Sequence, residues 1–162
     1  MVHCEIDIRA DDGLREARRR LRRLRERAIN LGPAWNALLD WFADEERKQF
    51  RTEGTRWGRR WDPLQAETRT SKRSAGYPRD VLVRTHELRD QLTRRPFGVE
   101  RFDAHEAVLG TTLSYARFHQ RGTENIPRRK LFDARRVRDE GVTGRAVISW
   151  VVHGRASTRA RA

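Results

Sequence analysis

The chain has 162 residues, of which 36 are Lys or Arg and 23 are Asp or Glu, so its formal net charge is +13. Only 36% of the residues are hydrophobic, against roughly 45–50% in average soluble domains on a count that includes Gly. The length fits one domain with a modest core, and the charge favours a nucleic acid or an acidic protein surface as a neighbour.

The first residues predict a half-buried strand over 2–8, because apolar and polar side chains alternate there. The one cysteine of the chain, Cys4, lies in this segment, which indicates a buried thiol. A single cysteine excludes a disulfide framework within the chain and fits a reducing compartment. The segment is too short and too charged for a signal peptide, and the sequence has no run of about 18 apolar residues that would span a membrane.

A first helix is predicted from Asp11 or Asp12, either of which can cap it, to Leu31, just before Gly32 and Pro33. Its apolar positions recur at helical spacing and are Leu14, Ala17, Leu21, Leu24, Ala28 and Leu31. This stripe spans under three heptads, so packing onto the protein's own sheet or second helix is favoured over a coiled coil.

Arginines occupy most of the remaining surface of this first helix. Two interpretations stay open, namely a solvated face or a basic face against nucleic acid or an acidic neighbouring subunit. The second has force because like charges in one helix repel unless something offsets them. Candidates for the partner contact are Arg18, Arg22 and Arg25.

A second helix is predicted over 34–50, and its aromatic and aliphatic positions indicate a core-facing stripe. The residues that trace this face are Trp35, Leu38, Leu39, Phe42, Glu46 and Phe50. On the same helix Asp44, Glu45 and Glu46 stand beside Arg47 and Lys48. That arrangement predicts exposed charge pairs rather than a general acid and base.

The segment 51–80 has no hydrophobic period and is rich in Gly, Thr, Ser, Arg and Lys. It is predicted to be a long basic loop, and a loop of this length in a compact domain is usually functional or disordered. Trp57 and Trp61 stand among arginines. They either pin the loop onto the core or form a stacking platform for single-stranded nucleic acid. We expect the loop to become ordered on assembly, with both tryptophans as interface anchors.

Beyond the loop, a short helix is predicted over 85–92, capped by Thr85. The segments 96–103 and 106–113 predict a β-hairpin that turns near Ala104 and His105. A helical turn follows over 115–120, ended by Gly122.

The C-terminal part is less regular in pattern. Residues 126–132 are predicted to be extended, because Pro127 biases its predecessor away from helix. The β-branched stretch 145–152 fits a helix or a strand, with Thr143 as a possible helix cap. Residues 154–162 predict a flexible basic tail after a single domain over 1–153.

Groups that could carry chemistry are scattered along the chain. The histidines, His3, His86, His105, His119 and His153, have no metal-ligand spacing, and no glycine-rich phosphate cradle occurs. The sequence therefore predicts a protein that is not an enzyme and needs no cofactor or metal. No pair of short helices forms a helix-turn-helix, and the arginines are spread over the whole chain rather than gathered in one recognition element.

Three phrases, in this order and at this spacing, resemble the phage virion morphogenesis (tail completion) proteins over about residues 50–132. The first phrase is Gly54 followed by Trp61, Pro63 and Leu64, and the second is Leu82, Arg84, Thr85 and Leu88. The third phrase is Tyr115, Ala116, His119, Gln120, Gly122, Ile126, Pro127 and Arg129.

One position departs from the family pattern, because His86 stands where the family usually has glycine. If that position adopts positive φ, His86 tolerates it at a cost or takes another turn. The third phrase makes physical sense as a folded corner: Tyr115 and Phe118 supply apolar mass, a buried His119 is hydrogen-bonded, and Gly122 permits the reversal of the chain.

The resemblance implies an α+β fold, expected here as two N-terminal helices packed on a small antiparallel sheet. It further implies a structural virion protein, made in the host cytoplasm, that forms a homo-oligomeric ring at the head–tail junction around the DNA channel. Its partners would be the connector or stopper, the tail terminator and the tail tube, with non-specific contact to genomic DNA. The alternatives are a tail terminator and, from another class, a basic DNA-binding protein.

Overall fold

The structure is a computed structural model that describes residues 10–159. The predicted strand over 2–8, with Cys4, lies outside the described residues. The helices are α1 (Ala10–Ile29), α2 (Gly32–Arg51), the 3-10 turn η1 (Thr55–Trp57), α3 (Ala66–Ser74), α4 (Glu87–Thr93), α5 (Ala116–Arg121), α6 (Ala134–Asp139) and α7 (Val142–His153). The strands are β1 (Val99–Phe102) and β2 (Ala107–Gly110), which pair antiparallel. This combination confirms the α+β fold class.

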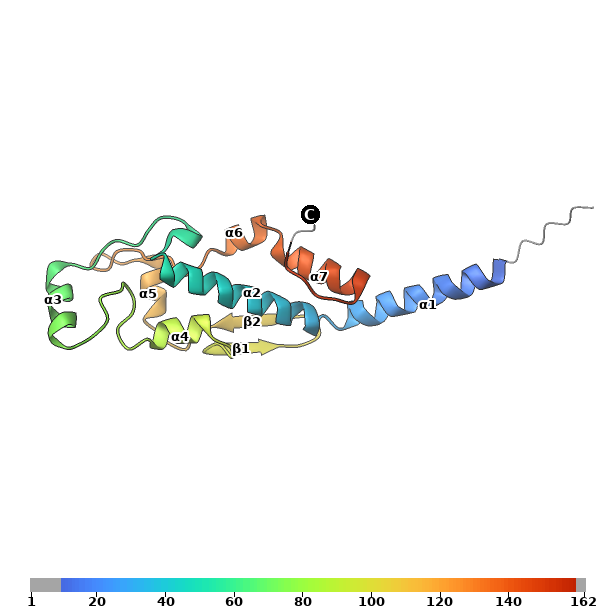
Figure 1. Ribbon diagram of the computed structural model, residues 1–162, viewed down its shortest axis with the longest axis horizontal. Helices are drawn as coiled ribbons and strands as arrows, with labels where there is room; N and C mark the ends of the chain where they lie inside the picture. The colour runs from blue at the N-terminus through green and yellow to red at the C-terminus, as the bar shows by residue number, and fades with distance from the viewer. Residues whose placement is uncertain (1–9, 160–162) are drawn as a thin grey trace, which may run out of the picture.

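Helix α2 is the central element, with the β-hairpin and α4 on one side and α6 and α7 on the other (Figure 1). Gly32 and Pro33 begin this helix rather than only ending the one before, since proline is well suited to the first turn. Its predicted core face is confirmed, because Leu39, Phe42 and Phe50 are buried.

The core has two clusters, one near each end of α2. Leu39, Phe42 and Ala43 pack against Phe97 at the hairpin, with the rings of Phe42 and Phe97 edge to face. The second cluster gathers residues from the end of α2, the predicted loop, the chain before α4, α4, α5 and the chain after α5. It consists of Phe50, Trp61, Val81, Val83, Leu88, Leu92, Ala116 and Leu131.

Helix α1 does not pack on the sheet or along α2, so this part of the predicted architecture is wrong. It projects from the end of the body (Figure 1), and Leu14 and Leu21 of its apolar stripe are 54% and 65% exposed. Only its last turn is held: Trp150 of α7 donates its indole N–H to the carbonyls of Arg27 and Asn30. The sequence pattern identified an amphipathic helix correctly, but it could not say whether the apolar partner belongs to the same chain.

The hairpin and the short helices around it confirm the predictions for 96–113 and 115–120. Leu88 and Leu92 of α4 are buried as expected. The cap of α4 differs, because His86 and not Thr85 occupies that position, with a left-handed φ of 67°. His86 therefore adopts the conformation that glycine would adopt most readily.

The segment 51–80 is not a structureless loop. It contains η1 and α3, and Trp57 and Trp61 are 1% and 4% exposed, so they pin the segment to the core. Lys72 of α3 is also buried and donates to the carbonyls of Asp80 and Val83, which closes the far end of the segment. Aromatic burial and local hydrogen bonds thus hold the segment against its own subunit. That it becomes ordered only on assembly stays a prediction.

The ambiguous stretch 145–152 is helical, within α7. Gly141, in a left-handed conformation, precedes this helix in place of the expected cap Thr143. Beyond α7 the chain through Arg159 runs back along α7, where Arg145 donates to the carbonyl of Thr158 and Ser149 to that of Arg155. The flexibility of the tail stays a prediction.

Candidate functional site

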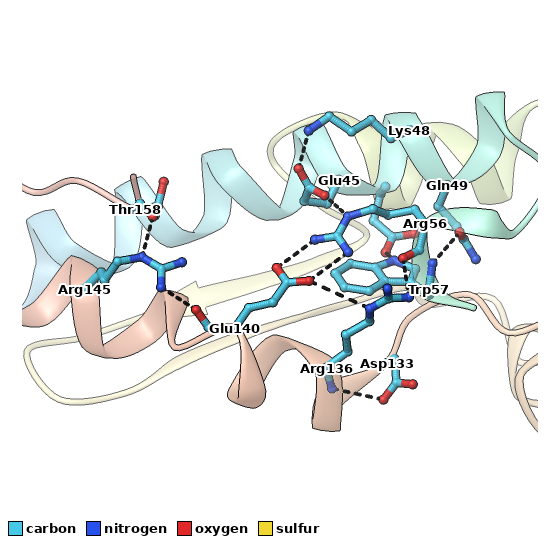
Figure 2. A network of polar contacts seen from close by, with 11 residues as sticks. Glu45, Lys48, Gln49, Arg56, Trp57, Asp133, Arg136, Glu140, Arg145 and Thr158 are labelled. Carbon is cyan, nitrogen blue, oxygen red and sulfur yellow. Dashed lines mark hydrogen bonds and ion pairs between the residues drawn. The ribbon is translucent and has the colours of Figure 1, made fainter. Parts of the chain in front are cut away.

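A partly buried ionic network joins α2, η1 and the end of α6 (Figure 2). Arg56 donates two hydrogen bonds, of 2.9 and 2.8 Å, to the carboxylate of Glu140, and a further one to Glu45. The Arg56 guanidinium also lies over the ring of Trp57, 4.3 Å from its centroid. These bonds lower the pKa of Glu140 and raise that of Arg56 against the effect of burial. The network therefore clamps the C-terminal helices to α2.

Beside this network Trp57 and Glu46 form a second buried contact. The indole N–H of Trp57 donates to Glu46 at 2.7 Å, and its backbone N–H donates to the amide oxygen of Gln49 at 3.1 Å. Glu46 is 0% exposed. Burial raises its pKa to about 8, so the carboxyl is mostly protonated near neutral pH.

Of the predicted exposed charge pairs, Asp44 with Arg47 is confirmed. Glu45 does pair with Lys48, but Glu45 and Glu46 are buried, so their predicted exposure is wrong. The sequence held a signal for Glu46, because it falls on the same helical stripe as Phe42 and Phe50. Sequence reasoning missed Arg56 and Glu140 altogether, because no local pattern pairs residues so far apart in the chain.

The three family phrases meet at one end of the molecule. Lys130, after α5, accepts hydrogen bonds through its carbonyl from Gln49 at 2.6 Å and from the indole of Trp61 at 2.9 Å. Arg129 is buried and donates to the carbonyls of Asp62 and Pro63. Backbone carbonyls in the first phrase and directly after the third thus accept hydrogen bonds from side chains of distant segments.

Gln120 and Gly122 build the corner predicted for the third phrase. The Gln120 side chain accepts from the backbone N–H of Leu131 at 2.7 Å and donates to the carbonyl of Phe132 at 2.8 Å. Gly122 has a φ of 79°, and a Cβ there would lie 3.1 Å from Arg128. His119 departs from the prediction, because it is half-buried and its Nδ1 has no hydrogen-bond partner among the described residues. Burial, followed by the charge of Arg129, lowers the pKa of His119.

A cleft of about 960 Å³ lies between the phrases. Residues of all three line it, including Pro63, Leu64, Arg84, Thr85, Leu88, Tyr115, His119 and Pro127. Arg84 lies over the ring of Tyr77, and Tyr115 packs edge to face on His119. Gly54 lies outside the cleft and has a φ of 109°, where a Cβ would approach Trp61 to 2.6 Å. The phrases are therefore a structural unit in which distant segments hold one another.

The predicted partner-contact residues fall into two groups. Arg18, Arg22 and Arg25 are exposed on the projecting α1. Trp57 and Trp61 are buried inside the subunit and hydrogen-bonded there, which favours the interpretation that they pin the segment onto the core over that of interface anchors. An indole that is buried and already hydrogen-bonded within its own subunit has little exposed surface, and no free N–H, with which to bind a partner.

Two kinds of site are absent from residues 10–159. Within that range no group of three or more His, Cys, Asp or Glu side chains could hold a metal ion. Nor does the described part of the chain contain a helix long and apolar enough to cross a bilayer.

The fold and its polar clusters define a small basic α+β protein whose buried charges hold secondary structure together and whose first helix stands free. The sequence model of the phage virion morphogenesis family matches residues 12–149. The chain therefore belongs to the phage virion morphogenesis family and has a role in building the phage particle. No curated protein matches the chain, and neither does a solved structure.

Proposed function

We propose that this protein acts in tail completion, joining head to tail as a subunit of a homo-oligomeric ring at the neck of the phage particle. The ring surrounds the channel through which DNA leaves, and it meets the connector or stopper, the tail terminator and the tail tube. Membership of the virion morphogenesis family supports a particle-building role, and the finer role is the proposal.

The observation that carries the proposal is the free helix α1. A helix of 20 residues is about 30 Å long, and its apolar positions Leu14 and Leu21 remain exposed. Large exposed apolar positions along one helix mark an interaction site. A subunit with such a projecting arm is suited to bind a neighbour in an assembly.

The positive charge is consistent with a place beside DNA. A formal net charge of +13 attracts a polyanion without regard to sequence. Arginines on α1 and elsewhere would then face the channel or an acidic partner surface, and binding would weaken steeply as salt is added.

Deletion of the gene from the phage or prophage tests the proposal. We expect filled heads and separate tails that fail to join, seen by negative-stain electron microscopy, with recovery when the gene is supplied in trans. Normal infectious particles from the deletion would contradict it. Tails of uncontrolled length would instead favour the tail terminator role. Selection of one duplex sequence over random DNA by on the order of 10³-fold would favour the DNA-binding alternative.

A further inference from the structure

The β-hairpin has an open edge that lies in an apolar groove. The sheet of the described residues contains β1 and β2 alone, so β2 pairs with β1 on one side and presents its other edge. Each residue from Ala107 to Ser114 lines a groove of about 730 Å³. The rest of its lining is largely apolar and includes Leu38, Trp41, Leu131, Phe132 and Val137.

Such an edge fits an added strand. An open strand presents a row of backbone N–H and C=O groups that can pair with another extended chain, and a sheet of two short strands is only marginally stable in water. Recognition by strand addition combines these backbone bonds with pockets that take alternate side chains. An occupant of this groove would therefore be an extended segment with apolar residues at every second position.

The sequence of residues 2–8, which lie outside the described range, has this pattern. Val2, Cys4, Ile6 and Ile8 alternate with His3, Glu5 and Asp7. In an extended segment the first set shares one face and the second set the other. The same segment contains no Lys or Arg, although 36 of the 162 residues of the chain are basic. The groove lining includes Arg117 and Arg121, which are exposed, so the charges of the segment and of the groove are complementary.

The segment cannot reach the groove of its own chain while α1 stays helical. Residues 1–9 join the far end of α1, which points away from the body and is tied to α7 at its base (Figure 1). Fully extended, these residues span about 30 Å. The helix itself is about 30 Å long, so the segment could return only to the base of α1 and not lie along β2.

We propose that residues 2–8 of one copy add to the β2 edge of the next copy and fill its apolar groove. This inference rests on the proposed ring and names the contact that builds it. The contact is heterologous, because the arm of one subunit meets a different surface on its neighbour, and repeated heterologous contacts close into a ring when the rotation allows. Direct insertion of α1 is disfavoured, since its arginines would face Arg117 and Arg121.

The single cysteine of the chain provides the test. In an extended segment Cys4 falls on the same face as Ile6. On β2, Ala107 and Leu109 lie on the same face of the strand, and Leu109 packs against the core cluster of α2. Two copies are mixed, one with Cys4 as its only cysteine and one carrying Cys4→Ser together with Ala107→Cys. A third copy carries Cys4→Ser with Leu109→Cys, to cover the neighbouring register. The control carries Cys4→Ser with Arg69→Cys, at an exposed position on α3.

We expect a disulfide-linked pair of chains from a β2 cysteine and at least tenfold less from the control. We also expect deletion of residues 2–9 to abolish the oligomer while leaving the thermal unfolding of the subunit unchanged, with Ile6→Asp in the full chain giving the same loss of assembly.

A disulfide within a single chain carrying both Cys4 and Ala107→Cys would overturn the inference, as would a disulfide from β2 to a different virion protein. If the ring forms without the linkage and survives the deletion, the inference fails and the proposed function stands. A protein that is monomeric and absent from the neck of particles defeats both.

Discussion

Trp57 and Glu46 form a hydrogen bond inside the protein, from the indole N–H to a carboxyl that is fully buried. The second oxygen of that carboxyl, Oε2, has no partner among the described residues. A charged carboxylate in this position would be costly, which is why the pKa of Glu46 is raised to about 8. Glu46 should therefore contribute to the dependence of stability on pH.

Glu46→Gln should flatten the dependence of stability on pH. The folded state keeps the Glu46 proton up to about pH 8, whereas the unfolded chain loses it near the usual glutamate pKa of 4.5. The unfolded state thus binds fewer protons within this window, and the free energy of unfolding falls as pH rises from about 4.5 to about 8. Urea unfolding across this range measures it. Because Gln keeps an acceptor for Trp57, parallel profiles for the wild type and Glu46→Gln would contradict the assignment.

Arg56→Gln should destabilise the protein by about 1–3 kcal/mol, because the buried carboxylate of Glu45 is left with Lys48 alone and the half-buried Glu140 loses two charge-assisted hydrogen bonds. The matched control is Arg59→Gln, whose ion pair with Asp62 is largely exposed and should be worth about 0–1 kcal/mol. Chemical denaturation at neutral pH compares the two. Equal effects would show that the Arg56 network is no stronger than a surface pair.

Gly54→Ala should destabilise the subunit by roughly 1–3 kcal/mol, since positive φ and a close approach combine there. The added Cβ would lie 2.6 Å from the Trp61 ring and 2.9 Å from the carbonyl of Arg59. Gly144→Ala is the control, because a Cβ at that position on α7 meets nothing within 4 Å; in a helix this change should stabilise by about 0.5–1 kcal/mol. Thermal unfolding of both variants gives the comparison, and a Gly54→Ala variant as stable as wild type would refute the close approach.

His86→Gly should raise stability relative to His86→Ala. The backbone of His86 has a φ of 67°, a conformation that is unfavourable by about 1–2 kcal/mol for residues with a Cβ. Both variants remove the imidazole, so the difference between them reports the backbone alone. Calorimetry of the pair decides it, and an alanine variant at least as stable as the glycine variant would mean that the turn has another geometry.

Replacing Arg18, Arg22 and Arg25 together with Gln should leave the fold intact and impair particle assembly. The three side chains lie exposed on α1, where surface changes usually alter stability by less than about 0.5 kcal/mol. Circular dichroism checks the fold, and counting joined particles after complementation measures function. The same triple replacement with Lys keeps the charge and should restore assembly if charge is what matters. Full activity of the Gln variant would assign these arginines to a solvated face.

Local pattern determined much of this protein in advance. The period of apolar residues defined α1 and α2, alternation around Ala104 and His105 defined the hairpin, and Gly122 marked the corner after α5. The family resemblance rested on phrases such as Trp61–Leu64, which the structure brings together around one cleft. Each of these features depends on residues close in the chain, where spacing and backbone preference are readable from the order of amino acids.

Tertiary structure alone decided the rest. The sequence treated Glu45 and Glu46 as exposed and residues 51–80 as a loop, because it could not show that Trp57 and Arg56 return to α2 and bury those carboxyls. It also assigned the apolar stripe of α1 to the protein's own core, whereas Leu14 and Leu21 remain exposed. A helical stripe shows that a partner surface is required, but whether that surface lies within the same chain depends on contacts between distant segments, which local periodicity does not encode.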